Sequence, residues 1–163
     1  MDKVEPILAT LRKYFRFSEG QIPHDAEDML FEVGKVSEAL LYSLLFVPSF
    51  SIVEDSVLLT NGAQDVGQRF LEAKRAGRMS LDRLEASFNR IEIPFMFSDR
   101  NFGNNEEYLL ADRIADAWRG SLAQWHPDRR FVVTIVPPED NAGNIAVEFN
   151  ENRSQRPRAS EAR

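Results

Sequence analysis

The 163-residue chain contains no cysteine and only two histidines, His24 and His126. The lack of cysteine excludes disulfides, metal sites built on thiolates and a cysteine nucleophile. His24 and Glu27 are three residues apart, a spacing that can place two metal ligands on one face of a helix. The neighbouring Asp25 instead favours a helix N-cap at this point. We therefore expect no metal site and no cofactor.

Long apolar runs are also absent. No uninterrupted apolar stretch reaches the ~18–20 residues that a membrane span needs. The first six residues, MetAspLysValGluPro, hold no basic region followed by an apolar block, so the sequence predicts no signal peptide. Together with the missing cysteines, these features predict a cytoplasmic protein that does not bind a membrane.

The sequence lacks the common short motifs of catalysis and nucleotide binding. It has no Gly-x-Ser-x-Gly nucleophile elbow, no Gly-x-Gly-x-x-Gly and no phosphate loop ending in Gly-Lys-Ser or Gly-Lys-Thr. The last two absences exclude nucleotide chemistry by those two routes. We therefore assign no catalytic residue and favour a protein that is not an enzyme, although side chains distant in the sequence can still converge in a site.

Positive charge is scarce outside the C-terminus. The net charge is −6, and residues 152–163 contain four arginines and one glutamate, or +3. The first 151 residues therefore carry −6 − 3 = −9. This acidic body repels phosphate backbones, which argues against nucleic-acid binding. It also favours a basic protein partner and speeds the encounter with one.

The densest apolar stretch runs from Ala39 to Val53 and ends a helix predicted to begin near Asp25. Apolar residues recur in this helix at steps of three or four, which places them on one face: Met29, Val33, Val36, Leu40, Leu44 and Val47. From Leu40 onward apolar residues occupy nearly all sides, so we expect Leu44 to lie in the core. Pro48 is expected to end the helix.

The remaining sequence predicts further helices and short strands. Steps of three and four residues indicate helices over 3–16, from 61 to 77 with Gly77 as its end, from 80 to 91 with Ser80 as its cap, and over 104–125. The predicted buried face of the last helix is Ala111, Ile114, Ala115, Trp118, Leu122 and Trp125. Alternating or continuous apolar runs indicate strands over 49–53, 57–59, 93–97, 131–136 and 145–150. Pro94 places its strand at a sheet edge. The strand over 131–136, apolar on both faces, is expected to be central.

This order of elements predicts an α+β fold, because strands do not alternate regularly with crossover helices. We expect a mostly antiparallel sheet of four to five short strands, with the long helices packed on one face. Residues 1–151 are expected to form a single domain. Residues 152–163 have no apolar periodicity and are predicted to be a disordered, arginine-containing tail.

Two polar loops, 98–106 and 137–144, are where we expect binding residues. Their carboxylates and amides can serve as acid, base or hydrogen-bonding groups, although the same residue types also build turns and caps. The candidate binding residues are Asp99, Asn101, Asn104, Glu139, Asp140 and Asn141.

Two functions fit these features. The preferred one is a non-enzymatic, acidic protein-binding module: an adaptor, an inhibitor or an immunity-type protein that acts on a protein partner. It is preferred because the body is acidic and catalytic motifs are missing. The alternative is a small enzyme or ligand-binding domain that uses the two polar loops. The sequence leaves the oligomeric state open.

Overall fold

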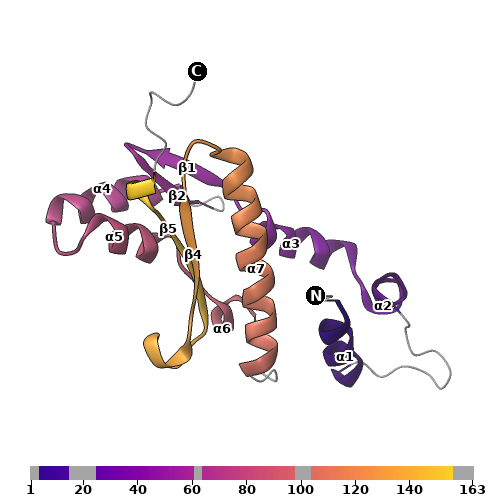
Figure 1. The fold of residues 1–163 in the computed structure, drawn as a ribbon. Helices are drawn as coiled ribbons and strands as arrows, with labels where there is room; N and C mark the ends of the chain where they lie inside the picture. Colours follow the sequence, from indigo (N-terminus) through magenta and orange to yellow (C-terminus); the bar gives the residue numbers. More distant parts are fainter. Residues whose placement is uncertain (1–3, 15–24, 61–63, 98–103, 156–163) are drawn as a thin grey trace. The chain divides into compact units, whose positions relative to one another are not determined.

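The structure is a computed structural model that describes residues 4–14, 25–60, 64–97 and 104–155. Its helices and antiparallel strands confirm the predicted α+β class (Figure 1). The chain divides into two compact units, Met1–Ser43 and Leu44–Arg163. The expected single domain over residues 1–151 stays a prediction.

The first unit contains α1 (Val4–Tyr14), α2 (Ala26–Val33) and the first turns of α3 (Val36–Phe46). Helices α1 and α2 contact each other, and Leu8 of α1 and Met29 of α2 are buried. Asp25 is the N-cap of α2, as the sequence predicts: its Oδ1 accepts a hydrogen bond of 2.9 Å from the amide of Asp28. A carboxylate at this position satisfies an amide that has no partner within the helix.

The single helix predicted from Asp25 to Pro48 is wrong, because the helix is interrupted at Gly34. The backbone of Gly34 is extended, with φ −74° and ψ 143°, and its amide still donates to the carbonyl of Leu30. A Cβ atom at Gly34 would lie only 2.4 Å from that carbonyl oxygen. The interruption therefore depends on glycine, a dependence that the regular spacing of apolar residues does not reveal.

The expected burial of α3 is also wrong. No residue of α3 is buried, and the side chains of Leu40 and Leu44 are 67% and 50% exposed. Only Leu45 and Phe46, at the end of the helix, pack against the main core. An all-apolar helix surface indicates burial in a finished assembly. It does not show whether the covering residues belong to the same chain.

The second unit contains two antiparallel sheets. Strands β1 (Phe50–Val53) and β2 (Ser56–Leu59) form a hairpin, and β3 (Ile91–Glu92), β5 (Ala146–Glu151) and β4 (Phe131–Val136) form a sheet in that order. The five strands are thus divided between two sheets. The central strand is β5, and the prediction that 131–136 is central is wrong. An apolar run reports what covers a strand's faces, whereas its place in the sheet depends on which edges are paired.

The strand predicted over 93–97 is wrong as well. Strand β3 ends at Glu92, and the helical turn α6 (Ile93–Met96) follows, with Pro94 in its first turn. Proline fits the start of a helix because its missing amide proton would have no partner there. Only Ile93 of α6 is buried, so the alternation of apolar residues at 93, 95 and 97 does not mark a sheet face here.

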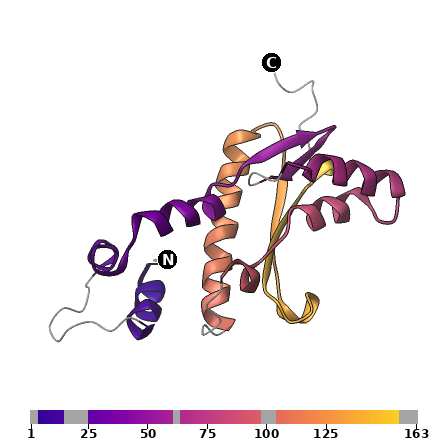
Figure 2. The same ribbon diagram turned by 180° about the vertical axis from the view of Figure 1, so that it is seen from behind.

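Helix α7 (Asn104–Trp125) packs against β4 and β5 and forms the main core with them (Figures 1 and 2). Its buried stripe is the predicted one: Ala111, Ile114, Ala115, Trp118 and Leu122. The ring of Trp118 meets Phe149 edge to face, and its Nε1 donates a hydrogen bond of 2.7 Å to the carbonyl of Leu45. Trp125 departs from the prediction, because it is 66% exposed at the end of the helix.

Helices α4 (Val66–Ala76) and α5 (Leu81–Phe88) form a second, smaller core with β2. Leu58, Phe70 and Leu84 are buried together there. Gly77 ends α4 in the left-handed conformation, with φ 63°, and the Ser80 side chain caps α5, both as the sequence predicts. In Figures 1 and 2, α7 lies on one side of β4 and β5 and the pair α4–α5 lies on the other.

The described chain continues past the predicted start of the tail. The amide of Asn152 donates to the carbonyl of Arg130, and a short 3₁₀ helix, η2 (Arg153–Gln155), follows. Arg153 is bonded to groups of α5, as shown below. Residues 152–155 are therefore ordered, which corrects that part of the tail prediction. Residues 156–163 lie outside the described residues, and their expected disorder stays a prediction.

Candidate functional site

The structure tests the six candidate loop residues only in part. Asp99, Asn101 and the side chain of Asn104 lie outside the described residues. Glu139 and Asp140 belong to a 3₁₀ helix, η1 (Pro138–Asp140), and are exposed at the tip of the connection between β4 and β5. Whether the loops 98–106 and 137–144 meet stays untested. Two of the six residues thus form a described, exposed carboxylate pair.

Asn141 is buried and holds its own loop in place. Its Oδ1 accepts a hydrogen bond of 3.1 Å from Arg90, and its Nδ2 donates one of 3.1 Å to the carbonyl of Asn144. Arg90 in turn donates from Nε to Glu148 of β5 over 2.8 Å. Both polar ends of the Asn141 amide are therefore occupied within the protein. These bonds give it a structural role in the turn that carries Glu139 and Asp140.

The sequence alone does not predict an arginine–carboxylate cluster that the structure contains, formed by Glu85, Glu151, Arg129 and Arg153. Both carboxylates are 1% exposed. Arg153 donates to both oxygens of Glu85, with Nη1 to Oε2 measuring 3.0 Å, and Arg129 donates to Glu151 over 3.1 Å. The amide of Glu151 also donates to Glu85 over 3.1 Å. Each buried carboxylate thus has a cation beside it.

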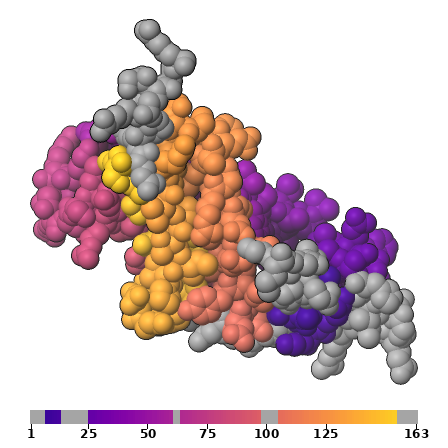
Figure 3. Space-filling model, in the orientation of Figure 1, coloured from indigo at the N-terminus to yellow at the C-terminus, as the bar shows by residue number. Residues whose placement is uncertain are grey.

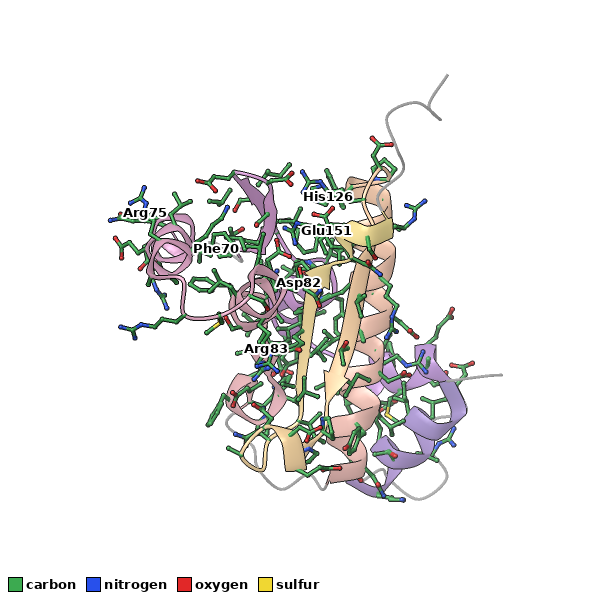
Figure 4. All side chains as sticks on the ribbon, turned by 60° about the vertical axis from the view of Figure 1, so that its left-hand side comes forward. Phe70, Arg75, Asp82, Arg83, His126 and Glu151 are labelled. Atoms are coloured by element: carbon green, nitrogen blue, oxygen red, sulfur yellow. The ribbon has the colours of Figure 1, made fainter. Side chains whose placement is uncertain are left out.

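The arginine–carboxylate cluster joins segments that are far apart in the sequence. Arg129 also bonds Asp55 in the β1–β2 turn, and Arg153 also bonds Asp82 in α5. Figure 4 shows Asp82 and Glu151 near each other at one end of the sheet. The hydrogen bond to Glu85 is the main cause that raises the pKa of Arg153, so the guanidinium of Arg153 stays charged. Since each buried carboxylate is paired with an arginine, and removing one partner would leave a buried charge uncompensated, we assign the cluster a structural role.

His126 follows α7 and packs as an aromatic side chain against Phe50 and Phe131. Its Nε2 is buried and has no hydrogen-bond partner among the described residues. Burial lowers the pKa of His126, Arg129 lowers it further, and Glu151 opposes this change. Within the described ranges, no group of three or more metal-binding side chains is present. The ring therefore packs as an aromatic side chain of the core, and burial favours its uncharged form.

The clearest surface feature is a line of apolar side chains along α3, which we call the α3 surface: Val36, Leu40, Leu44 and Val47. Their exposed fractions are 79%, 67%, 50% and 62%. The steps of four, four and three residues place them along one side of the helix. In the space-filling view of Figure 3 the atoms of α3 are coloured purple. An exposed apolar face of this kind is a place where another molecule can bind.

The α3 surface lies in an acidic part of the chain. Residues 25–47 contain five carboxylates, at positions 25, 27, 28, 32 and 38, and one lysine, so their net charge is −5 + 1 = −4. The lysine, Lys35, donates to Glu38 over 2.7 Å, and this bond raises its pKa. Glu27 and Glu32 are exposed on α2. The segment thus combines exposed apolar groups with excess negative charge.

No helix in the described part of the chain has the length and apolar content needed to cross a membrane. Comparison with protein-family models, with curated proteins and with solved structures finds no match to this chain.

Proposed function

We propose that this protein is a non-enzymatic, acidic protein-binding module, of the adaptor, inhibitor or immunity type, that binds a basic protein partner through the α3 surface. The observation that carries the proposal is the exposure of Leu40 and Leu44 within a segment of charge −4. Water contact with these side chains is unfavourable, and covering them releases about 25 cal/mol for each Å² of apolar area. A protein partner supplies the cover that the chain's own core does not.

The negative charge of the chain favours a basic partner over an acidic one. The first 151 residues carry −9, so basic proteins are attracted and acidic ones repelled over the screening distance of about 8 Å at physiological salt. The apolar groups supply affinity, and the surrounding carboxylates supply encounter rate and selectivity. This division of roles resembles the usual anatomy of an interface, with an apolar centre and a polar rim.

Affinity capture with a double variant tests the proposal. Tagged wild-type protein and the variant Leu40→Gln with Leu44→Gln are used on extracts of the source cells, and the retained proteins are quantified. Glutamine keeps helix propensity while removing the apolar surface. The matched control replaces two exposed apolar residues elsewhere, Ile52→Thr with Val132→Thr.

We expect wild type and control to retain the same protein and the α3 double variant to lose most of it. Equal retention by all three contradicts a role for α3. Recovery of a small molecule with the wild type, and of no protein, favours instead the enzyme or ligand-binding alternative built on the loops 98–106 and 137–144.

A further inference from the structure

We infer that the partner covers the α3 surface with an amphipathic helix of about three turns, whose apolar side is flanked by lysine and arginine. This inference rests on the proposed function and specifies the partner's contacting segment. It follows from three properties of α3: its length, the saturation of its backbone and the charge around it.

The length of the α3 surface sets the length of the partner segment that can cover it. Helix α3 has 11 residues and is therefore about 16 Å long. Val36 lies at its first residue and Val47 directly after its last, so the stripe runs the whole length. A partner helix that crosses α3 at a shallow angle contacts such a stripe over about three turns. A single inserted side chain would leave most of the stripe exposed.

The backbone of α3 favours a helix over an extended peptide. An extended peptide binds by adding main-chain hydrogen bonds to the open edge of a strand. In α3 the interior amides and carbonyls are bonded within the helix, so this route is closed. What α3 presents is a row of branched side chains at steps of three and four, which forms the ridges and grooves into which another helix packs.

The surrounding charge selects a basic helix. Residues 25–47 carry −4, and their one lysine is already paired with Glu38. A second copy of this chain would bring another −4 against the first. An anionic membrane surface would be repelled in the same way. Lysine and arginine beside the apolar side of the partner helix instead compensate the negative charge of this segment.

Site-specific photo-cross-linking tests this inference. The photoreactive amino acid p-benzoylphenylalanine replaces Leu40 in the full chain, expressed in the source cells, and the attached peptides are sequenced by mass spectrometry. The matched control places the same group at Gln124, an exposed residue of α7. We expect Leu40 to be joined to a segment with apolar residues at steps of three and four and an excess of lysine and arginine, and Gln124 to lack that adduct.

Other outcomes overturn the inference in distinguishable ways. A protein adduct at Leu40 whose segment is acidic or lacks helical periodicity rejects the partner's chemistry and leaves the proposed function standing. An adduct to a second copy, to the same chain or to lipid shows that a different group covers α3. Absence of any protein adduct at Leu40, together with equal capture by the α3 double variant, rejects the proposed function itself.

Discussion

Asn89, the residue that follows α5, bonds through its side-chain amide to the main chain of β2. It is fully buried, its Nδ2 donates to the carbonyl of Val57 over 2.9 Å, and its Oδ1 accepts from the amide of Leu59 over 2.7 Å. The side-chain amide therefore satisfies two main-chain groups on an edge of β2. Because such groups are costly to bury alone, the arrangement fixes α5 against the hairpin.

Replacing Asn89 by leucine leaves both main-chain groups without this partner. Each unsatisfied buried group costs about 1–3 kcal/mol, so we expect the free energy of unfolding to fall by roughly 2–6 kcal/mol. Urea denaturation followed by circular dichroism measures the change. Gln124→Ala, an exposed substitution in α7, serves as control, and a loss no larger than that of the control would show that the two bonds contribute little.

His126 links stability to pH. Its pKa is lowered in the folded protein, mainly by burial and then by Arg129, against the opposing effect of Glu151 from β5. The unfolded chain therefore binds the proton more tightly. This contribution to stability is complete above the unfolded pKa of about 6.5 and is lost as the pH falls through the lower folded pKa.

The variant His126→Phe keeps an aromatic ring between Phe50 and Phe131 and removes the titration. We expect the wild-type free energy of unfolding to decline as the pH falls below about 6.5, the unfolded pKa, and that of the variant to stay flatter. Urea titrations at several pH values provide the comparison. Parallel curves for the two proteins would show that His126 does not carry the effect.

At the scale of elements, local signals in the sequence predict helix ends well and burial poorly. Asp25, Gly77 and Ser80 act at helix ends as predicted, because capping depends on neighbouring residues alone. The buried stripe of α7 was also predictable, since one face is apolar and the other polar. Helix α3 has no such contrast, so its sequence does not tell which side faces the core.

The exposure of Leu44 changes the expected effect of a charge there. Although the sequence predicts that Leu44→Asp prevents folding, we now expect this variant to fold, with a melting temperature close to that of wild type, because the side chain is half exposed. Leu122→Asp is the matched comparison in α7, where the side chain is 1% exposed and a buried carboxylate costs several kcal/mol. Failure of both variants to fold would indicate that the side chain of Leu44 is buried in the core.

The last described element predicts where the chain tolerates truncation. Ending the chain after Gln155 keeps Arg153, so we expect little change in melting temperature. Ending it after Glu151 removes Arg153 and leaves Glu85 buried without its main cation, at a cost of about 3 kcal/mol. Thermal unfolding of the two truncated proteins tests the difference, and equal melting temperatures would show that Arg153 is dispensable.

The arginine–carboxylate cluster shows why the contribution of Arg153 to stability could not be predicted from the sequence. Its members come from α5, β5, the segment after α7 and η2, and no spacing in the chain relates them. The arginines of the C-terminal segment have the composition of a solvated tail. Only the fold places Arg153 beside Glu85. The same limit applies to Asn141, whose amide is occupied by Arg90, a residue distant in the sequence.

At the scale of the whole molecule, net charge governs the rate of encounter. Glu139 and Asp140 are exposed at the tip of the loop between β4 and β5, so their replacement alters charge without disturbing a core. For Glu139→Gln with Asp140→Asn, we expect slower association with the basic partner and little change in dissociation. Surface plasmon resonance at several salt concentrations measures both rates. An effect that does not shrink with added salt would exclude an electrostatic origin.

The central claim is that the α3 surface is exposed in the free protein and covered in the complex. Hydroxyl-radical footprinting measures it directly, by comparing oxidation of Leu40 and Leu44 before and after the captured partner is added. Leu122 is the buried reference and Leu30 the exposed one. The account predicts that Leu40 and Leu44 react like Leu30 in the free protein and become protected in the complex. Protection equal to that of Leu122 in the free protein would contradict it.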